Sequence, residues 1–528
     1  MRWSYRAAGT LILTFLSLSA ASAQTGFKIS FPKPDGKMPW SGQTPAKPHP
    51  GLCLLSYRIS TNSPECQAFF DQGLAYYYSY VYMEACRSFE TATRYDPDCP
   101  MAWWGLSRAL DQHKRGGVNE ALLIAQKLLP KASHRESFLI TARLQEKGIA
   151  AGVKPDQRKK SAAKTIDELL TLYDDDEEGW FYRAQLSDGG VSAVPYYKAL
   201  LRVNPLHPGA NHELVHFYEG YQRPALGWVY AENYIKSSPG IPHPFHMQAH
   251  LATRLGRWDK TGDRSARAIE LERAYHQELN VKPSEDYQYP HHLEILTLSL
   301  IHDGRFQEAR TIKAEVARCG YKQELVWFRL HLAERAWDEA LKLIAEQRKT
   351  DKVTASYMAA LLYLKQGDAA RAAPEIEVLQ HAYAEKRTDA ALEYRLWETQ
   401  GLLLCETGAA DAGLKLLTRA VDKSKNDFWH HSWGNGAYYM EAWGTAALHA
   451  GNEEVAEEAF LEALAHDPGS VRAALGMQVL CERRARSDEA QRYAKLAHRC
   501  WTRADSGALD AELAGMRKGD STAQTTEK

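Results

Sequence analysis

Residues 66–97 read CQAFFDQGLAYYYSYVYMEACRSFETATRYDP. Apolar and small residues recur in this stretch at the spacing of two amphipathic helices joined by a short turn. Gly73 and Ala85 are small enough to let the two helices approach closely, and Phe89 supplies a bulky contact between them. Pro97 ends the second helix. The stretch therefore predicts an antiparallel helix pair.

The spacing matches the tetratricopeptide repeat (TPR), a helix-turn-helix unit of about 34 residues. The matching residues are Phe69, Gly73, Tyr76, Ala85, Phe89, Ala92 and Pro97. The pattern recurs in residues 360–379, 397–420 and 439–468, and more loosely in 291–319 and 325–348. Each unit buries its apolar stripe only against its neighbours. We therefore predict an all-α fold, a TPR-type α-solenoid in which antiparallel helix pairs form a right-handed superhelix with a concave face lined by first helices.

The N-terminal residues have the pattern of a secretion signal. Arg2 and Arg6 precede the apolar run 11–18, and the small residues 21–23 follow it. We expect a signal peptide over residues 1–23, cleavage after Ala23, and a periplasmic or secreted protein. A retained membrane anchor is the disfavoured alternative, because roughly 8 apolar residues fall short of the ~20 that span a bilayer. No stable membrane insertion is expected.

Composition divides the rest of the chain into four parts. Residues 24–60 are rich in Pro and Gly and predict an extended arm. Residues 61–274 predict an N-terminal TPR-like array and residues 275–505 a C-terminal TPR array. Residues 506–528 are small and polar, which predicts a flexible tail.

The formal net charge of -1 gives no electrostatic reason to expect binding to nucleic acid. The eight cysteines include no C-x-x-C pair. Cys66, Cys86 and Cys99 lie in the first repeat and its exit, where a disulfide is plausible in an exported protein. The other cysteines are interpreted as small buried residues or optional pairs.

Two histidine pairs stand one repeat apart. His212 and His216 are spaced i,i+4, and His246 and His250 repeat that spacing 34 residues later. Residues four apart share a helix face, and adjacent first helices pack ~8–10 Å apart, so the four imidazoles can converge on one ion or one ligand group.

Further polar residues extend this set. Aligning the next unit through an insertion places Glu294 in register with His212 and His246, and His291 in register with His243. Glu219 lies one turn beyond His216. We predict His212, His216, His246 and His250 as metal ligands, with the following as candidate additional ligands: Glu219, His243, Glu294 and His291.

Imidazole nitrogens at helical spacing suit Zn or Cu. Two other readings stay open: a polar groove that binds a carboxylate or a peptide, and a hydrogen-bonded structural cluster. Residues 212–216 also form H-E-x-x-H, in which Glu213 would be the catalytic base of a Zn-dependent hydrolase. The equivalent residue of the next repeat is Met247, so Glu213 is not part of the repeated pattern.

Several segments resemble a group of exported bacterial TPR proteins. They are Phe70-Asp-Gln-Gly-Leu74, Asp96-Pro97 through Gly105, the H-P-G-A-x-H-x-x-x-H-x-x-E run from His207 to Glu219, and H-M-x-x-H from His246 to His250. The resemblance covers residues 66–274 and implies the fold, export and a shared histidine site, but no reaction. In that group another residue usually stands at Glu213 and a proline at Gln248.

The leading hypothesis is an exported TPR scaffold that binds a protein or peptide in its concave groove, with a histidine cluster that holds a transition metal. The alternative is the Zn-dependent hydrolase with Glu213 as base. The sequence favours a scaffold over an enzyme, because the H-E-x-x-H motif falls in a repeat array rather than in a protease fold.

Overall fold

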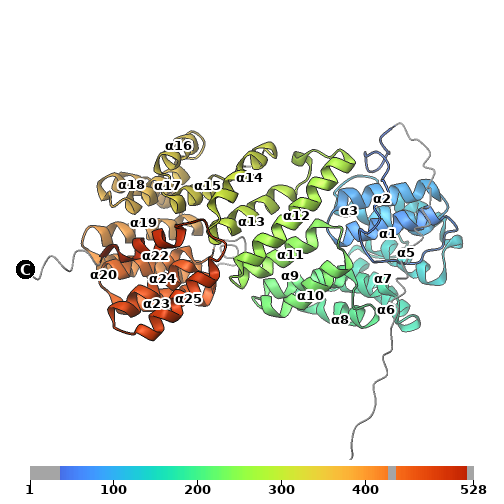
Figure 1. Cartoon of the computed structure of the whole chain (residues 1–528). Coiled ribbons are helices and arrows are strands. Elements are labelled where there is room, and N and C mark those ends of the chain that lie inside the picture. The colour runs from blue at the N-terminus through green and yellow to red at the C-terminus, as the bar shows by residue number, and fades with distance from the viewer. Residues whose placement is uncertain (1–35, 321, 426–435, 520–528) are drawn as a thin grey trace, which may run out of the picture. The chain divides into compact units, whose positions relative to one another are not determined.

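A computed structural model describes residues 36–320, 322–425 and 436–519, and these contain helices and no strand (Figure 1). The α-helices are α1 (Pro64–Tyr78), α2 (Tyr82–Tyr95), α3 (Pro100–Gln112), α4 (Val118–Lys127), α5 (His134–Glu146), α6 (Arg158–Leu172), α7 (Glu177–Gln185), α8 (Val194–Val203), α9 (Pro208–Gly220), α10 (Pro224–Ser237), α11 (Pro242–Arg254), α12 (Trp258–Leu279), α13 (Tyr289–His302), α14 (Phe306–Arg318), α15 (Glu324–Glu334), α16 (Trp337–Arg348), α17 (Lys352–Lys365), α18 (Ala369–Glu385), α19 (Ala390–Glu406), α20 (Ala410–Ser424), α22 (Tyr438–His449), α23 (Glu453–His466), α24 (Val471–Arg483), α25 (Ser487–Cys500) and α26 (Ala508–Met516). The short 3-10 helices are η1 (Leu129–Lys131), η2 (Pro155–Gln157), η3 (Gly190–Ser192), η4 (Pro283–Glu285) and η5 (Arg517–Gly519). The signal peptide expected over residues 1–23 lies outside the described residues.

Helix pairs follow one another along the chain, and each packs against the next (Figure 1). In the first repeat, the contact that sets the helix spacing is Phe89 of α2, whose ring lies wedged between Gly73 of α1 and Gly105 of α3. A Cβ on Gly73 would stand 2.7 Å from the Phe89 ring, and one on Gly105 would stand 2.6 Å from it. The ring thus fixes α1, α2 and α3 at their closest approach. The all-α, TPR-type solenoid predicted from the sequence is confirmed.

The same wedge recurs near the C-terminal end of the array. Phe460 of α23 is fully buried. Its ring lies 2.6 Å from the position of a Cβ on Gly444 and 2.2 Å from that of a Cβ on Gly476. Two repeats more than 350 residues apart therefore use one packing rule.

Residues 36–63 precede α1 and contain no helix. Backbone groups of this arm bond to the repeats, because an extended segment has no internal partners for its N–H groups. Trp40 N donates to Glu90 Oε1 at 3.0 Å, and Leu54 N donates to Ser237 O at 2.7 Å. Met38 is almost fully buried.

The end of α1 reaches the later helix α9. Tyr80 has a positive φ of 60°, which turns the chain sharply between α1 and α2. Ser79 accepts a hydrogen bond from Tyr234 Oη at 2.8 Å. Tyr80 of this turn lies against His212 and His216 of α9 and His243 of α11.

Two boundaries differ from the expected ones. The division between residues 274 and 275 falls inside α12, which continues unbroken to Leu279. The expected flexible tail from residue 506 contains α26, whose Met516 is buried against the preceding repeats. Leu509, Leu513 and Met516 recur at the helical spacing of one face, and this stripe orders the segment despite its small and polar neighbours.

Within the described residues, the longest and most apolar helices still fall short of what crossing a bilayer requires.

The packing of Phe89 between Gly73 and Gly105 predicts a loss of stability that depends on which glycine is substituted. Gly105→Val should lower the free energy of unfolding by roughly 1–3 kcal/mol, because the added methyl groups overpack against Phe89. Gly220→Val is the matched control, since a Cβ at Gly220 meets nothing within 4 Å. Urea denaturation followed by circular dichroism measures both; equal losses in the two variants would contradict the wedge.

Candidate metal centre

The histidines come from three first helices that lie side by side, α9, α11 and α13 (Figure 1). Pro208 and Pro242 stand in the first turn of α9 and α11, where their missing N–H groups would have had no helical partner. Both helices therefore begin at the same point of the repeat. The i,i+4 pairs then project from equivalent turns.

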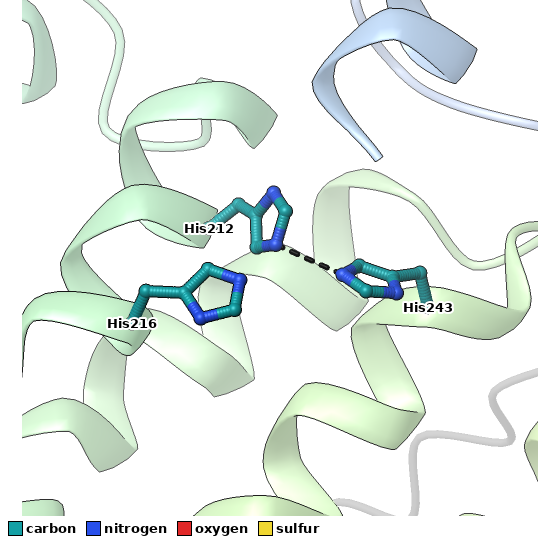
Figure 2. Close-up of side chains that lie close together, drawn as sticks. All are labelled: His212, His216 and His243. Atoms are coloured by element: carbon teal, nitrogen blue, oxygen red, sulfur yellow. Dashed lines mark hydrogen bonds between the residues drawn. The ribbon is translucent and has the colours of Figure 1, made fainter. Parts of the chain in front are cut away.

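The first cluster consists of His212 and His216 of α9 and His243 of α11. One ring nitrogen from each lies within 4.8 Å of the others. His212 Nε2 and His243 Nε2 are 2.9 Å apart, and Figure 2 shows the three rings turned toward one another.

Hydrogen bonds define the tautomer of His212. Its Nδ1 lies 2.6 Å from the carbonyl oxygen of Tyr78, which can only accept, so Nδ1 carries the proton. The Nε2 lone pair of His212 is thereby left facing His243. His216 Nε2 and His243 Nδ1 have no hydrogen-bond partner among the described residues. Two buried ring nitrogens of this cluster therefore find no partner in the part of the chain that the structure describes.

The second cluster consists of His246 and His250 of α11 and His291 of α13. His250 Nε2 and His291 Nε2 are 3.4 Å apart. His250 Nδ1 lies 3.1 Å from Glu219 Oε1, a carboxylate acceptor, so its Nε2 lone pair also faces into the cluster. His246 Nδ1 has no hydrogen-bond partner in the described part of the chain. Like the first cluster, the second has two facing Nε2 atoms, but the facing ring is the second member of its i,i+4 pair, His250, rather than the first.

The four histidines of the sequence pattern are therefore divided between two groups rather than gathered at one. Each i,i+4 pair is completed by a histidine near the start of the next first helix, His243 in one case and His291 in the other. Successive first helices are staggered, so the first turn of one helix lies beside the middle of the preceding one. Of the candidate additional ligands, His243 belongs to the first cluster and His291 to the second.

The two carboxylates lie around the second cluster. Glu219 bonds His250 and lies 3.8 Å from Arg254. Glu294 Oε2 lies 3.6 Å from His291 Nδ1. Burial alone would raise the pKa of the Glu219 carboxyl, but His250 and Arg254 hold it below its ordinary value. These carboxylates orient imidazoles from outside, as the outer partners of metal-bound histidines do.

Burial keeps four of the imidazoles neutral. Loss of water lowers the pKa of His212, His243 and His246 well below the ordinary value, and neighbouring imidazoles lower it further. The pKa of His216 falls to about 4, again mainly through burial. Neutral imidazoles retain the lone pair that a metal requires.

Tyr80 covers the first cluster. Its ring centroid lies 4.4 Å from that of His212, and it stacks nearly parallel to His216 at 5.8 Å. Its hydroxyl donates to Glu213 Oε1 at 2.8 Å. Burial raises the pKa of Glu213. Glu213, the glutamate of the H-E-x-x-H motif, thus accepts a hydrogen bond from Tyr80, the residue that covers the cluster.

The sequence did not single out two residues beside the second cluster. His292 is buried, and its ring centroid lies 4.0 Å from that of His246. Its Nδ1 lies 2.8 Å from Glu272 Oε1 of α12. The adjacent His291-His292 pair was a signal for His292, whereas nothing in the sequence around Glu272 distinguishes it from a surface glutamate.

The nitrogen spacing fits a small divalent ion. Zn–N bonds of about 2.0–2.1 Å in tetrahedral geometry place ligand nitrogens roughly 3.3 Å apart. The facing Nε2 pairs, at 2.9 and 3.4 Å, lie on either side of that value. Each cluster can therefore supply three nitrogen ligands and leave one position for another group.

Buried neutral histidine predicts acid sensitivity even without metal. His207 caps α9 by accepting from Ala210 N, and burial lowers the pKa of His207 to about 3. Between pH 6.5 and 3 the unfolded chain binds a proton at His207 that the folded chain does not. The free energy of unfolding therefore decreases as the pH is lowered, by up to about 1.4 kcal/mol per pH unit for this residue. His207→Asn replaces the capping ring nitrogen with an amide oxygen, which can also accept from Ala210 N, and removes the titration.

Urea denaturation in EDTA at pH 7, 6 and 5 should therefore give a shallower loss of stability for His207→Asn than for the wild type. Parallel losses in the two proteins would show that His207 binds its proton in the folded state.

Comparison with known proteins bears on the fold rather than on the histidines. A model of the tetratricopeptide repeat family, described as "Tetratricopeptide repeat", matches residues 70–133. No curated protein matches the chain. The matched residues run from α1 to the start of α5 and include the Phe89 wedge. Residues 70–133 are thus similar to tetratricopeptide repeats, within a chain that folds as an all-α solenoid of that type.

Proposed function

We propose that this protein is an exported TPR scaffold for a protein or peptide partner, and that each histidine cluster binds one transition metal ion. One observation carries the metal proposal. In both clusters two Nε2 atoms face each other, while an acceptor outside the cluster holds the Nδ1 proton of one ring: Tyr78 O for His212 and Glu219 for His250.

Hydrogen bonding alone satisfies these rings poorly. A bond between His212 and His243 uses one proton and one lone pair and leaves His216 Nε2 without a partner. An unsatisfied buried polar atom costs about 1–3 kcal/mol. A metal ion accepts one lone pair from each of three imidazoles and removes this cost at His216.

The ligand set favours Zn or Cu. Both ions take neutral imidazole nitrogen readily, whereas Mg and Ca prefer oxygen. The fourth position in each cluster would hold water or a carboxylate oxygen, and the second cluster has Glu219 and Glu294 nearby.

The metal would act structurally. An ion in the first cluster joins α9 to α11, and an ion in the second joins α11 to α13. In a repeat array the contacts between neighbouring repeats carry much of the stability. Since the clusters are covered, the partner would bind elsewhere on the first helices, in the concave groove that the repeat pattern predicts.

Partner binding is supported by the repeats themselves, which are typical of protein-interaction scaffolds. Export is supported by the charged, apolar and small-residue segments of the first 23 residues and by the resemblance to exported TPR proteins. These two observations support the proposal of a periplasmic or secreted location.

One observation favours the Zn-dependent hydrolase as a second candidate. His243 completes a three-histidine set around the H-E-x-x-H motif, and Glu213 lies beside it, bonded to Tyr80. Tyr80 would have to move before a substrate and water could reach Glu213. We therefore rank the scaffold first.

Untagged protein should bind two equivalents of Zn or Cu, measured by calorimetric titration and elemental analysis. His216→Ala and His250→Ala should each lose one equivalent, and the double variant both. At free metal 100-fold above Kd, each filled site should stabilise the fold by about 2.7 kcal/mol.

His498→Ala is the matched control, because this histidine is exposed on α25 and belongs to neither cluster. It should retain both equivalents. A wild-type protein that binds no stoichiometric metal, and regains none when Zn or Cu is added, would contradict the metal proposal and leave the scaffold alone.

Glu213→Gln separates the two candidate functions. It keeps a hydrogen-bond acceptor for Tyr80 and removes the base, so metal content should stay at two equivalents. A peptidase or esterase activity present in the metal-loaded wild type and abolished in Glu213→Gln would establish the hydrolase instead.

A further inference from the structure

Two buried thiols meet at the junction of the first two repeats. Cys66 lies in the first turn of α1, where its backbone N–H donates to the capping Ser63 Oγ at 3.1 Å. Cys99 is the residue that caps α3. Both are fully buried, and their sulfur atoms lie within 4.8 Å of each other.

From these positions we infer that Cys66 and Cys99 form a disulfide in the mature protein, which ties the start of α1 to the start of α3. The sequence left three cysteines open as partners in this region. The structure brings two of them together, and Cys86 of α2 is not in their group.

The sulfurs need little movement to bond. A disulfide requires an S–S distance of about 2.05 Å, and rotation about the Cα–Cβ bond moves a sulfur by an ångström or more. Both residues sit at helix starts, where the backbone directions are already set by a proline at N1 or N2 of each helix. The hydrogen bond between the two thiols, together with loss of water, raises the pKa of Cys66, whereas the same hydrogen bond lowers the pKa of Cys99.

A metal site is the weaker reading of the same pair. Asp96 is the third group within reach, but its Oδ1 accepts from Asp98 N at 3.1 Å and its Oδ2 accepts from Thr61 Oγ1. Three donors also fall short of the four that a structural Zn site uses.

The reaction is thiol–disulfide exchange with an external disulfide. One thiolate attacks the donor disulfide and releases one thiol; the second thiolate attacks the mixed disulfide and releases the other. Two thiols of the protein become one disulfide with the loss of two hydrogens, and the donor gains them. Because the folded thiols are buried, exchange takes place while the first repeat is still forming.

The test uses the full chain, folded in a buffer of glutathione and glutathione disulfide. It is then unfolded, alkylated without reductant, digested and analysed by mass spectrometry. We expect the Cys66 peptide linked to the Cys99 peptide, and Cys86 alkylated. Alkylation of both Cys66 and Cys99, or a link from either one to Cys86, would overturn the inference.

Stability gives a second measurement. The closed loop of 34 residues predicts that reductant lowers the thermal midpoint of the wild type by several degrees, of the order expected for loops of this length. Cys86→Ser should show the same drop, whereas the double variant Cys66→Ser/Cys99→Ser should be insensitive to reductant. A reductant-sensitive double variant, or a third equivalent of Zn that Cys66→Ser removes, would overturn the disulfide.

The double variant should keep both equivalents of metal bound by the histidines. Failure of the disulfide and failure of the metal proposal are thereby distinguished in one set of proteins.

Discussion

The stagger between successive first helices is the constraint on which the rest of the molecule depends. Phe89, seated between Gly73 and Gly105, sets the close approach of its neighbouring helices, and Phe460 does the same near the other end. Once the stagger is set, the first turn of each first helix lies beside the middle of the one before. Residues near the start of one repeat therefore meet residues from the centre of its predecessor.

This geometry explains why the histidines form two groups of three. The i,i+4 pair in each helix faces the next first helix. The stagger brings a histidine from the first turn of that next helix close to both members of the pair. A single group of four histidines would need the i,i+4 pairs of two neighbouring helices to lie at the same level along the helix axes. Cys66 and Cys99 meet differently, because they lie at the starts of α1 and α3.

The repeat pattern predicted the fold because it is local: small residues, a bulky contact and a closing proline all lie within 34 residues. The pattern also identified the histidines at 212, 216, 246 and 250, and placed His243 and His291 in register. It could not show how they divide, since that depends on the stagger between helices. Nor could it foresee Tyr80, because the turn at 78–80 reaches α9 only through the curvature of the intervening repeats. The helix α26 was missed because its stripe of Leu509, Leu513 and Met516 is short and surrounded by small polar residues.

The cover over the first cluster argues for a structural role of any metal bound there. A catalytic ion needs an open position that substrate can reach, whereas His212 is fully buried beneath Tyr80. The cross-links proposed for this chain all join consecutive first helices: α1 to α3 by sulfur, α9 to α11 and α11 to α13 by metal. The stability of a repeat array is approximately the sum of the stabilities of its single repeats and the energies of the interfaces between neighbours. Such links strengthen the interfaces. Stronger interfaces couple neighbouring repeats, so that they unfold together rather than one at a time. A partly opened array would expose the apolar stripes between its repeats, and coupling of the repeats would oppose that opening.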